Sequence, residues 1–387
     1  MGRYNKIKKD YQEGCIIIDS CPICSSKEKI EIFKEDNIPL FQNKIYPSKR
    51  EARLVKLGSI RLFLCKKCGF VWNANFDYEM LHYDSKYQNE QSYSREFKKH
   101  LDSVKQIIEE RNPLKSHIVE IGCGKGTFLN ILHDSGYFNI LGFDPAYEGE
   151  SPFIQKCYYP PEGNYSQADL FIMRHVLEHV PEPLNFLKSI CLANRKKSRI
   201  YIEVPAFEWI AKQGAFWDIS YEHCNYFTQS LLGSILPGCE TGYLFGDQYL
   251  YATGDFRIHT PKNTEYLDSK EAIILKNFKQ KMEFCKGFLA EHQNLALWGA
   301  GAKGVNFARM MDPDCEKIQC IVDINPKKQG HYIAGSAHPI ISPEELMKNN
   351  EIEGIIIMNE NYVPEIKSTM ESWKGNYFVL DKCLMKV

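Results

Sequence analysis

The stretch Val119–Leu129 reads VEIGCGKGTFL, a short apolar run that reaches an acidic residue and then places three glycines at alternate positions. Glycine has no Cβ, so a chain that turns through Gly122, Gly124 and Gly126 brings bare peptide groups against a ligand before a helix begins at Thr127. Turns of this kind join strand to helix in α/β folds that bind a nucleotide or a nucleoside. The stretch therefore predicts a buried strand whose carboxyl end forms a ligand-binding turn.

The glycine spacing and a nearby acidic residue distinguish this turn from a dinucleotide-binding turn. The glycine spacing is GxGxG rather than GxGxxG, and Glu120 stands two residues before the first glycine, where a carboxylate repels phosphate and suits a cationic or hydroxyl-bearing ligand. A second apolar run, 139–143, ends in Asp144-Pro145, where a carboxylate accepts hydrogen bonds from a ribose diol. Together with the glycines, Glu120 and Asp144 resemble the S-adenosylmethionine site of class I methyltransferases. An ordinary tight turn without a ligand is the alternative, and the placement of Asp144 weighs against it.

Length and composition limit the class of protein. A chain of 387 residues predicts two or three domains. Its 48 Lys and Arg balance 49 Asp and Glu, so no net field attracts nucleic acid, and no run of 18 apolar residues predicts a membrane span. The first residues, MGRYNKIKKDYQEG, lack the apolar core of a signal peptide, and 14 cysteines without such a signal favour a reducing compartment. We expect a cytoplasmic protein with neither a nucleic acid nor a membrane as partner.

Two CxxC pairs, CPIC and CKKC, stand near the N-terminus with 40 residues between their inner cysteines. Each CxxC turn directs two thiolates at one ion, and two such turns complete a tetrahedral zinc site formed by Cys21, Cys24, Cys65 and Cys68. Four protein ligands leave no position for water, so the predicted zinc is structural. A redox CxxC needs only one pair, and four unrelated thiols are the remaining alternative.

The stretch 83–101, YDSKYQNEQSYSREFKKHL, leads toward the glycine strand. It begins irregular and rich in tyrosine, and then predicts an amphipathic helix with Phe97, Leu101 and Val104 on one face. The tyrosines of its first half either close over a ligand or pack at a domain junction.

Residues 168–173, ADLFIM, predict a buried strand that runs into RHVLEHV. His175 and His179 would lie one helical turn apart, and HVLEH also matches the H-x-x-E-H pattern of inverted zinc peptidases. A catalytic zinc helix does not normally begin directly at a buried parallel strand. We therefore expect Arg174 and His175 to lie at the edge of the sheet where the cofactor binds.

A further strand, Arg199–Pro205, is followed by the dense cluster DISYEHCNYF. Neighbouring residues of a regular strand point in opposite directions, so Glu222 and His223 are expected in a loop. Histidine has the side-chain pKa best matched to proton transfer near neutrality, and a carboxylate can orient it. A loop histidine is often structural, but its place after a strand, at the edge where ligands bind, favours catalysis.

The last third of the chain predicts a second α/β unit. Ser269–His292 has the periodicity of a connecting helix, and a strand at 294–298 leads into GAGAKG, a true GxGxxG at Gly299–Gly304. The next strand, Ile318–Val322, ends in Asp323, the position of a ribose-binding acid. On these residues alone, an NAD-dependent oxidoreductase or a nucleotide-binding module is an alternative function.

The order of these motifs, CxxC/CxxC, EIGCGKG, RHVLEHV, YEHCNYF, WGAGAKG and DINPKKQG, resembles the zinc-containing, S-adenosylmethionine-dependent C-methyltransferases of nucleotide-linked keto-sugars. The resemblance covers nearly the whole chain. It implies an α/β fold with a four-cysteine zinc-binding domain at 1–80 and a class I methyltransferase Rossmann-like core at 81–258. It also implies a C-terminal Rossmann-like domain at 259–387 that helps to hold the nucleotide sugar without a nicotinamide.

The resemblance also implies roles for particular residues. His223 would be the general base, Glu222 its partner, and His179 a polar group near the sugar carbonyl. The family often has a tyrosine two residues before the loop Glu, where this chain has Ser220; the adjacent Tyr221 is the corresponding candidate. The cofactor would be held by Glu120, Gly122, Gly124, Gly126, Asp144, Pro145, Arg174 and His175.

The implied reaction is methylation of a carbon beside the ketone, in a monomer or small homo-oligomer that serves polysaccharide or secondary-metabolite biosynthesis. Proton abstraction beside a ketone produces a carbanion that attacks the sulfonium methyl group. O- or N-methylation of a nucleotide sugar or a related glycan precursor is the alternative.

Overall fold

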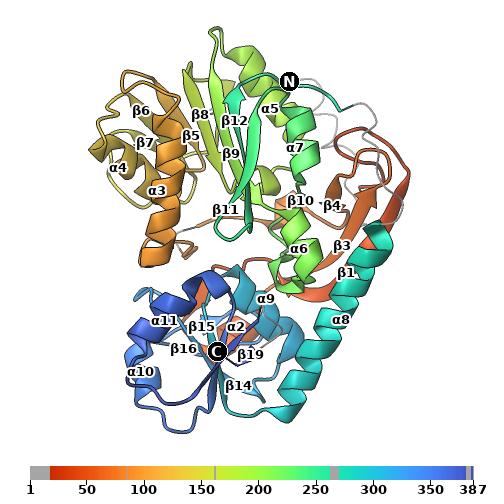
Figure 1. Ribbon diagram of the computed structural model, residues 1–387, viewed down its shortest axis with the longest axis vertical. Helices are drawn as coiled ribbons and strands as arrows, with labels where there is room; N and C mark the ends of the chain where they lie inside the picture. The colour runs from red at the N-terminus through yellow and green to blue at the C-terminus, as the bar shows by residue number, and fades with distance from the viewer. Residues whose placement is uncertain (1–17, 85, 161–162, 262–269, 381–384, 387) are drawn as a thin grey trace.

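The computed structural model of the chain describes residues 18–84, 86–160, 163–261, 270–380 and 385–386. Two lobes make up the molecule, and each is built on a mostly parallel sheet (Figure 1). A smaller antiparallel sheet from the N-terminal residues lies at the side of the two lobes (Figure 1).

The predicted connecting helix is present as α8, Lys270–Glu291, which runs along the side of the molecule in Figure 1. Ser269, where the prediction began, lies outside the described residues. In the described part of the chain, α8 included, no helix has both the length and the apolar character that a membrane crossing needs.

The upper lobe in Figure 1 contains a seven-stranded sheet in the order β11-β12-β9-β8-β5-β6-β7. β5 is the predicted glycine strand, and its two neighbours run parallel to it. Because the chain adds later strands first on one side of β5 and then on the other, the crevice at its carboxyl end is the switch point where such sheets bind ligands. The strands are β5 (Ile118–Ile121), β6 (Ile140–Phe143), β7 (Ile154–Gln155), β8 (Leu170–Arg174), β9 (Arg199–Pro205), β11 (Glu240–Leu244) and β12 (Tyr249–Asp255).

The helices around this sheet confirm two predictions. α4 (Thr127–Asp134) begins at the residue after the third glycine, as predicted. α3 (Arg95–Glu109) forms after the irregular tyrosine-rich stretch and buries its predicted face of Phe97, Leu101 and Val104. The other helices of this lobe are α5 (Pro183–Ala193), α6 (Phe207–Gln213) and α7 (Gln229–Ile235).

The N-terminal sheet includes a strand from much later in the chain. β1 (Lys29–Pro39), β3 (Leu57–Cys65) and β4 (Val71–Asn73) are joined by β10 (Asn225–Tyr226), which pairs with β4. β10 begins two residues after His223. The N-terminal sheet therefore fixes one end of the loop that contains the predicted base.

The lower lobe has a six-stranded sheet in the order β16-β14-β13-β17-β18-β19. Here too the strand that leads into a glycine turn, β13, has a parallel neighbour on each side. α9 (Ala302–Met311) begins within the predicted GxGxxG motif, three residues after Gly299. The strands are β13 (Leu295–Trp298), β14 (Ile318–Val322), β16 (Ile340–Ile341), β17 (Gly354–Ile357), β18 (Asn376–Val379) and β19 (Met385–Lys386), and the other helices are α10 (Pro343–Met347) and α11 (Val363–Thr369).

Polar contacts join the two lobes across the cleft between them. The carboxylate of Glu365, on α11, accepts from the hydroxyl of Ser94 at 2.5 Å and from the backbone N–H of Arg95 at 2.9 Å. The side-chain amides of Gln248 and Asn359 donate to each other at 2.9 Å. These bonds hold the two lobes in place on either side of the cleft.

Gly304 permits the close approach of α9 to the turn after β13. A Cβ built on Gly304 would overlap the carbonyl oxygen of Gly299, a backbone atom that cannot turn aside. We expect Gly304→Ala to destabilise the protein by about 1–3 kcal/mol, measured by urea denaturation. Gly301→Ala is the control, because its Cβ would come no closer than 3.8 Å to another atom. Equal denaturation midpoints for the two variants would contradict this account.

Candidate active site

A cleft of about 1410 Å³ lies between the lobes and contains both glycine turns. Gly124 lines one part of it, Gly301 another, and His179 and His223 also face it. Residues from the predicted cofactor, acceptor and proton-transfer sites thus line one cavity.

The first glycine turn is shaped by the carboxylate of Asp144. Gly122, Gly124 and Gly126 all have φ between 58° and 81°, in the left-handed region. The backbone N–H of Gly124 donates to Asp144 Oδ2 at 2.8 Å, and that of Ala146 donates to Oδ1 at 2.7 Å. A Cβ on Gly124 would meet no atom within 4 Å, so the turn opens onto free space. Pro145 lines the same part of the cleft.

Glu120 is buried beside this turn, and its Oε2 has no hydrogen-bond partner. Burial raises the pKa of this carboxyl to about 7, against the opposing effect of the Arg174 charge. A buried acceptor that lacks a partner stabilises a ligand that brings a positive charge or a hydroxyl group.

Arg174 and His175, at the end of β8, are held by the buried carboxylate of Glu203. Glu203 Oε1 lies 3.1 Å from Arg174 Nη2, 3.1 Å from His100 Nε2 and 3.2 Å from His175 Nε2. Tyr201 donates to Oε2 at 3.0 Å. Burial acts to raise the pKa of Glu203, but the charges of Arg174 and His100 hold it well below its usual range.

The helical turn predicted between His175 and His179 is wrong. His175 has a left-handed backbone (φ 55°), and its N–H donates to the Glu203 carbonyl at 2.8 Å. Only Leu177–His179 form a short 3-10 turn, η3. The chain leaves β8 through a left-handed residue, so the helix that a zinc-peptidase H-x-x-E-H motif requires does not form.

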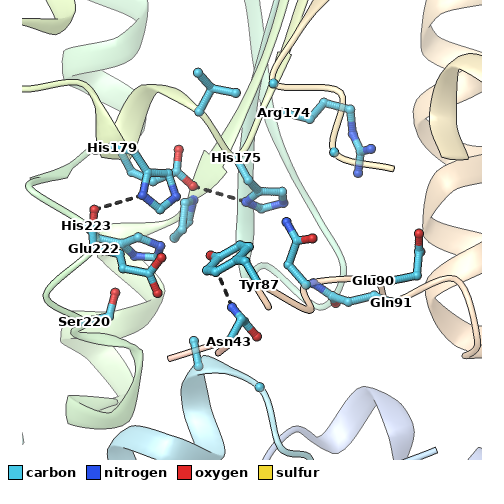
Figure 2. Close-up of a pocket in the computed structure, with 18 of the residues that line it drawn as sticks. Asn43, Tyr87, Glu90, Gln91, Arg174, His175, His179, Ser220, Glu222 and His223 are labelled. Carbon is cyan, nitrogen blue, oxygen red and sulfur yellow. Dashed lines mark hydrogen bonds and ion pairs between the residues drawn. The ribbon is translucent and has the colours of Figure 1, made fainter. Parts of the chain in front are cut away.

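His179 and His223 meet at the floor of the cleft (Figure 2). Their ring centroids are 4.8 Å apart, edge to face, and His179 Nδ1 donates to the Glu222 carbonyl at 2.9 Å. Burial, reinforced by the neighbouring His179, lowers the pKa of His223 to about 3. His223 is therefore a neutral imidazole near neutral pH, with a nitrogen free to accept a proton.

The carboxylate of Glu222 is directed toward the N-terminal residues. Its Oε2 accepts from the backbone N–H of Gln42 at 2.9 Å, and the hydroxyls of Tyr83 and Tyr87 are its other neighbours. Burial raises the pKa of Glu222. The ring of His223 is not among these partners.

Tyr221 was predicted to be a catalytic residue, but its side chain lies away from the cleft. It is fully buried, its hydroxyl accepts from the Asp77 N–H at 3.0 Å, and it is not one of the residues that line the cleft. Its ring packs beside Gly58 of β3, because successive residues of the loop point in different directions. Ser220, one residue earlier, does face the cleft.

Several cleft residues were not predicted as site residues. Glu90 accepts from the hydroxyl of Thr127 at 2.9 Å, and Asn43 donates to the hydroxyl of Tyr87 at 3.4 Å. Figure 2 shows Asn43, Tyr87, Glu90 and Gln91 around the same space as His175. The tyrosine-rich stretch was a signal for Tyr87, whereas no pattern in the sequence marks Asn43.

The second glycine turn has the same internal bonding as the first. The N–H groups of Ala300 and Asn325 each donate to Asp323 at 2.8 Å, one to each carboxylate oxygen. A Cβ on Gly299 would meet no atom within 4 Å. Lys303 lies at the start of α9, 3.0 Å from Asp218. This turn also opens onto the cleft.

The four predicted zinc ligands form one cluster. The sulfur atoms of Cys21 and Cys68 are 3.5 Å apart, and those of Cys24 and Cys65 are 3.6 Å apart. Zn–S bonds of about 2.3 Å in a tetrahedron place sulfur atoms about 3.8 Å apart. The cluster therefore fits a structural zinc ion.

Glu178, His179 and His223 are a second group with ligand-type atoms within 4.8 Å of one another. Three donors in an open cleft suit either a catalytic metal or a proton-transfer centre.

Comparisons with known proteins match both lobes. Residues 90–238 match a methyltransferase domain family, and residues 261–380 match a C-methyltransferase C-terminal domain family. C-methyltransferase NovU of Streptomyces niveus is 20% identical, over 90% of this chain and 91% of NovU. With the strand order around β5, these matches establish a class I methyltransferase Rossmann-like fold for the upper lobe.

Two solved structures with some likeness each cover less than half of the chain. Magnesium protoporphyrin IX methyltransferase of Synechocystis PCC 6803, with bound S-adenosylhomocysteine, is 16% identical over 41% of this chain and 83% of its own, with a TM-score of 0.32. A methyltransferase of Aquifex aeolicus is 15% identical over 47% of this chain and 100% of its own, with a TM-score of 0.32.

Elemental analysis distinguishes the two possible metal groups. We expect one zinc ion per chain in the purified protein, lost in Cys24→Ser because a tetrahedral site does not close with three thiolates. His179→Ala should retain the full zinc content. A second bound metal ion that His179→Ala removes would contradict the assignment of the cleft group to proton transfer.

Proposed function

We propose, from the premise that the chain is an S-adenosylmethionine-dependent methyltransferase with the domains of a C-methyltransferase, that it methylates a carbon beside the ketone of a nucleotide-linked keto-sugar. One observation carries the proposal: a single cleft joins the first glycine turn, a neutral buried histidine and the second glycine turn. These three parts suit a methyl donor, a proton acceptor and a nucleotide-bearing acceptor.

The first glycine turn and its two acids would hold S-adenosylmethionine, which supplies an electrophilic methyl group on sulfur. Asp144 lies at the carboxyl end of β6, where an acid contacts a ribose diol. Glu120, buried and without a partner on Oε2, would face a positive charge of the cofactor. Arg174, fixed by Glu203, would close the same end of the site.

The second glycine turn would hold the nucleotide part of the acceptor. The amino end of α9, ten residues long, opens onto the space beside Gly299 and Gly301, and N–H groups at a helix start favour an anion such as a diphosphate. Lys303 and Lys328 line the same region. The match of residues 261–380 to a C-methyltransferase domain favours this role over nicotinamide binding.

His223 would take the proton from the carbon beside the ketone. As a neutral ring on the cleft it can accept a proton. Burial raises the pKa of Tyr83 and Tyr87 well above the usual value, so both phenols stay protonated. They are donors suited to the enolate oxygen, with His179 close by.

We expect His223→Ala to lower turnover about 10²–10⁴-fold, because general-base catalysis contributes this much, while calorimetry shows an unchanged affinity for S-adenosylhomocysteine. His82→Ala is the matched control, since His82 is exposed and does not line the cleft.

Solvent deuterium exchange separates carbon methylation from the alternative. With S-adenosylhomocysteine bound, the wild type should exchange the hydrogen beside the ketone of a nucleotide keto-sugar, and His223→Ala should not. Methyl transfer without any exchange would indicate O- or N-methylation instead.

Affinity for S-adenosylmethionine should depend on pH through Glu120. Its raised pKa of about 7 means that this carboxyl is largely protonated below that pH in the free protein. Binding of a cation favours the carboxylate and releases the proton, so affinity should rise with pH up to about 7, by at most about tenfold per pH unit, and then level off. Calorimetry of Glu120→Gln should show a flatter profile; an unchanged profile would sink this role for Glu120.

A further inference from the structure

A carboxylate close to the proposed base belongs to Glu178, which the sequence did not mark as a site residue. Glu178 is buried, and its Oε1 lies 3.3 Å from Nδ1 of His175. One of its oxygens lies within 4.8 Å of a ring nitrogen of His179 and of His223. A buried carboxylate is costly unless a cation lies beside it, so the pairing of Glu178 with His175 in a reaction cleft needs an explanation.

Glu178 differs from Glu222 in its surroundings. Glu222 accepts from Gln42 and is next to phenols, and burial raises its pKa. Burial acts in the same direction on Glu178, but the contact with His175 more than offsets it and lowers the pKa of Glu178. Of the two carboxylates beside the histidines, Glu178 therefore has the lower pKa.

His175 holds Glu178 in place. Its Nδ1 lies 3.3 Å from Glu178 Oε1, and its Nε2 lies 3.2 Å from Glu203 Oε1. Burial acts to lower the pKa of His175, but the two buried carboxylates that its ring bridges raise it to about 9. Its left-handed backbone is fixed by the bond from its N–H to the Glu203 carbonyl. The His175 cation thus links Glu178 to Glu203, a residue of β9.

We infer that Glu178 acts through His223 as a positioning residue: its negative charge stabilises the imidazolium that forms when His223 takes the substrate proton, and His175 anchors that charge. This inference rests on the proposed function. In the step, the C–H bond breaks, its electron pair forms the enolate, and the proton bonds to His223 beside Glu178. The enolate carbon then forms the new C–C bond as the methyl–sulfur bond breaks, and the proton leaves His223 for solvent with the product.

The geometry explains how a weak base can work at this place. Burial and the nearby rings of His179 and His175 disfavour a charged His223 ring, whereas the charge of Glu178 favours it. An anion a few ångströms away acts strongly in a partly enclosed cleft. The carboxylate of Glu222 accepts from the Gln42 N–H instead, and it does not stabilise a charged His223 ring in this way.

Glu178→Gln tests the inference because it removes the charge and keeps the volume. We expect kcat to fall about 10²-fold, with KM for the keto-sugar and affinity for S-adenosylhomocysteine within about threefold of the wild type. Deuterium exchange beside the ketone should fall in the same proportion as kcat. Glu178→Asp, which restores the charge, should recover part of the rate. A kcat for Glu178→Gln within about threefold of the wild type would overturn the inference.

A double-variant cycle separates action through His223 from a structural role. In the His223→Ala background, Glu178→Gln should lower exchange and turnover no further, since the imidazolium that it stabilises cannot form. Additive losses, or a loss of cofactor affinity shared by Glu178→Gln and Glu178→Asp, would overturn the inference. Full activity of His223→Ala alone would instead defeat the proposed base, so the two failures are distinguishable.

Discussion

The centre of the molecule depends on the buried carboxylate of Glu203. A fully buried anion persists only when cations and donors surround it, and here Arg174, His100, His175 and the Tyr201 hydroxyl do so. These partners come from α3, the end of β8 and β9 itself. The charge therefore fixes the carboxyl edge of the sheet. The backbone carbonyl of the same Glu203 accepts from the His175 N–H, and this bond holds His175 in a backbone conformation that a non-glycine residue rarely adopts. Loss of this anion would leave two cations buried beside the cofactor end of the cleft.

The two lobes build their glycine turns in the same way. In each, an aspartate at the end of the next strand accepts one N–H from the glycine turn and one from its own loop, at 2.7–2.8 Å. The bonds hold the turn open, so the free space beside Gly124 and Gly299 is a property of the folded backbone. Two preformed turns that face one cleft suit a reaction with two nucleoside-bearing ligands.

Local sequence patterns predicted the parts of the fold that local physics decides. The strand into Gly122, the helix from Thr127, the buried face of α3 and the four-cysteine cluster all follow from periodicity or spacing within short stretches. The helical turn predicted for the H-x-x-E-H stretch is wrong, because a long-range hydrogen bond from the His175 N–H to the Glu203 carbonyl overrides the helical spacing. The positions of Tyr221, away from the cleft, and of Asn43, on it, could not be predicted for a related reason. Which side of a loop faces the cleft is set by the N-terminal sheet, whose packing no spacing in the sequence reveals.

Through the same N-terminal sheet, the proposed zinc ion would affect the proposed reaction indirectly. Cys65 ends β3 and Cys68 follows in the turn to β4, so a metal at the cluster would hold the edge on which β10 pairs. Asn73 N–H donates to the carbonyl of Cys224 at 2.9 Å, one residue after His223. On its other side, Cys224 Sγ donates to the Glu178 carbonyl at 3.3 Å. His223 and Glu178 are therefore both anchored to one edge of the N-terminal sheet, and a metal bound at the cluster would help to set the distance between them.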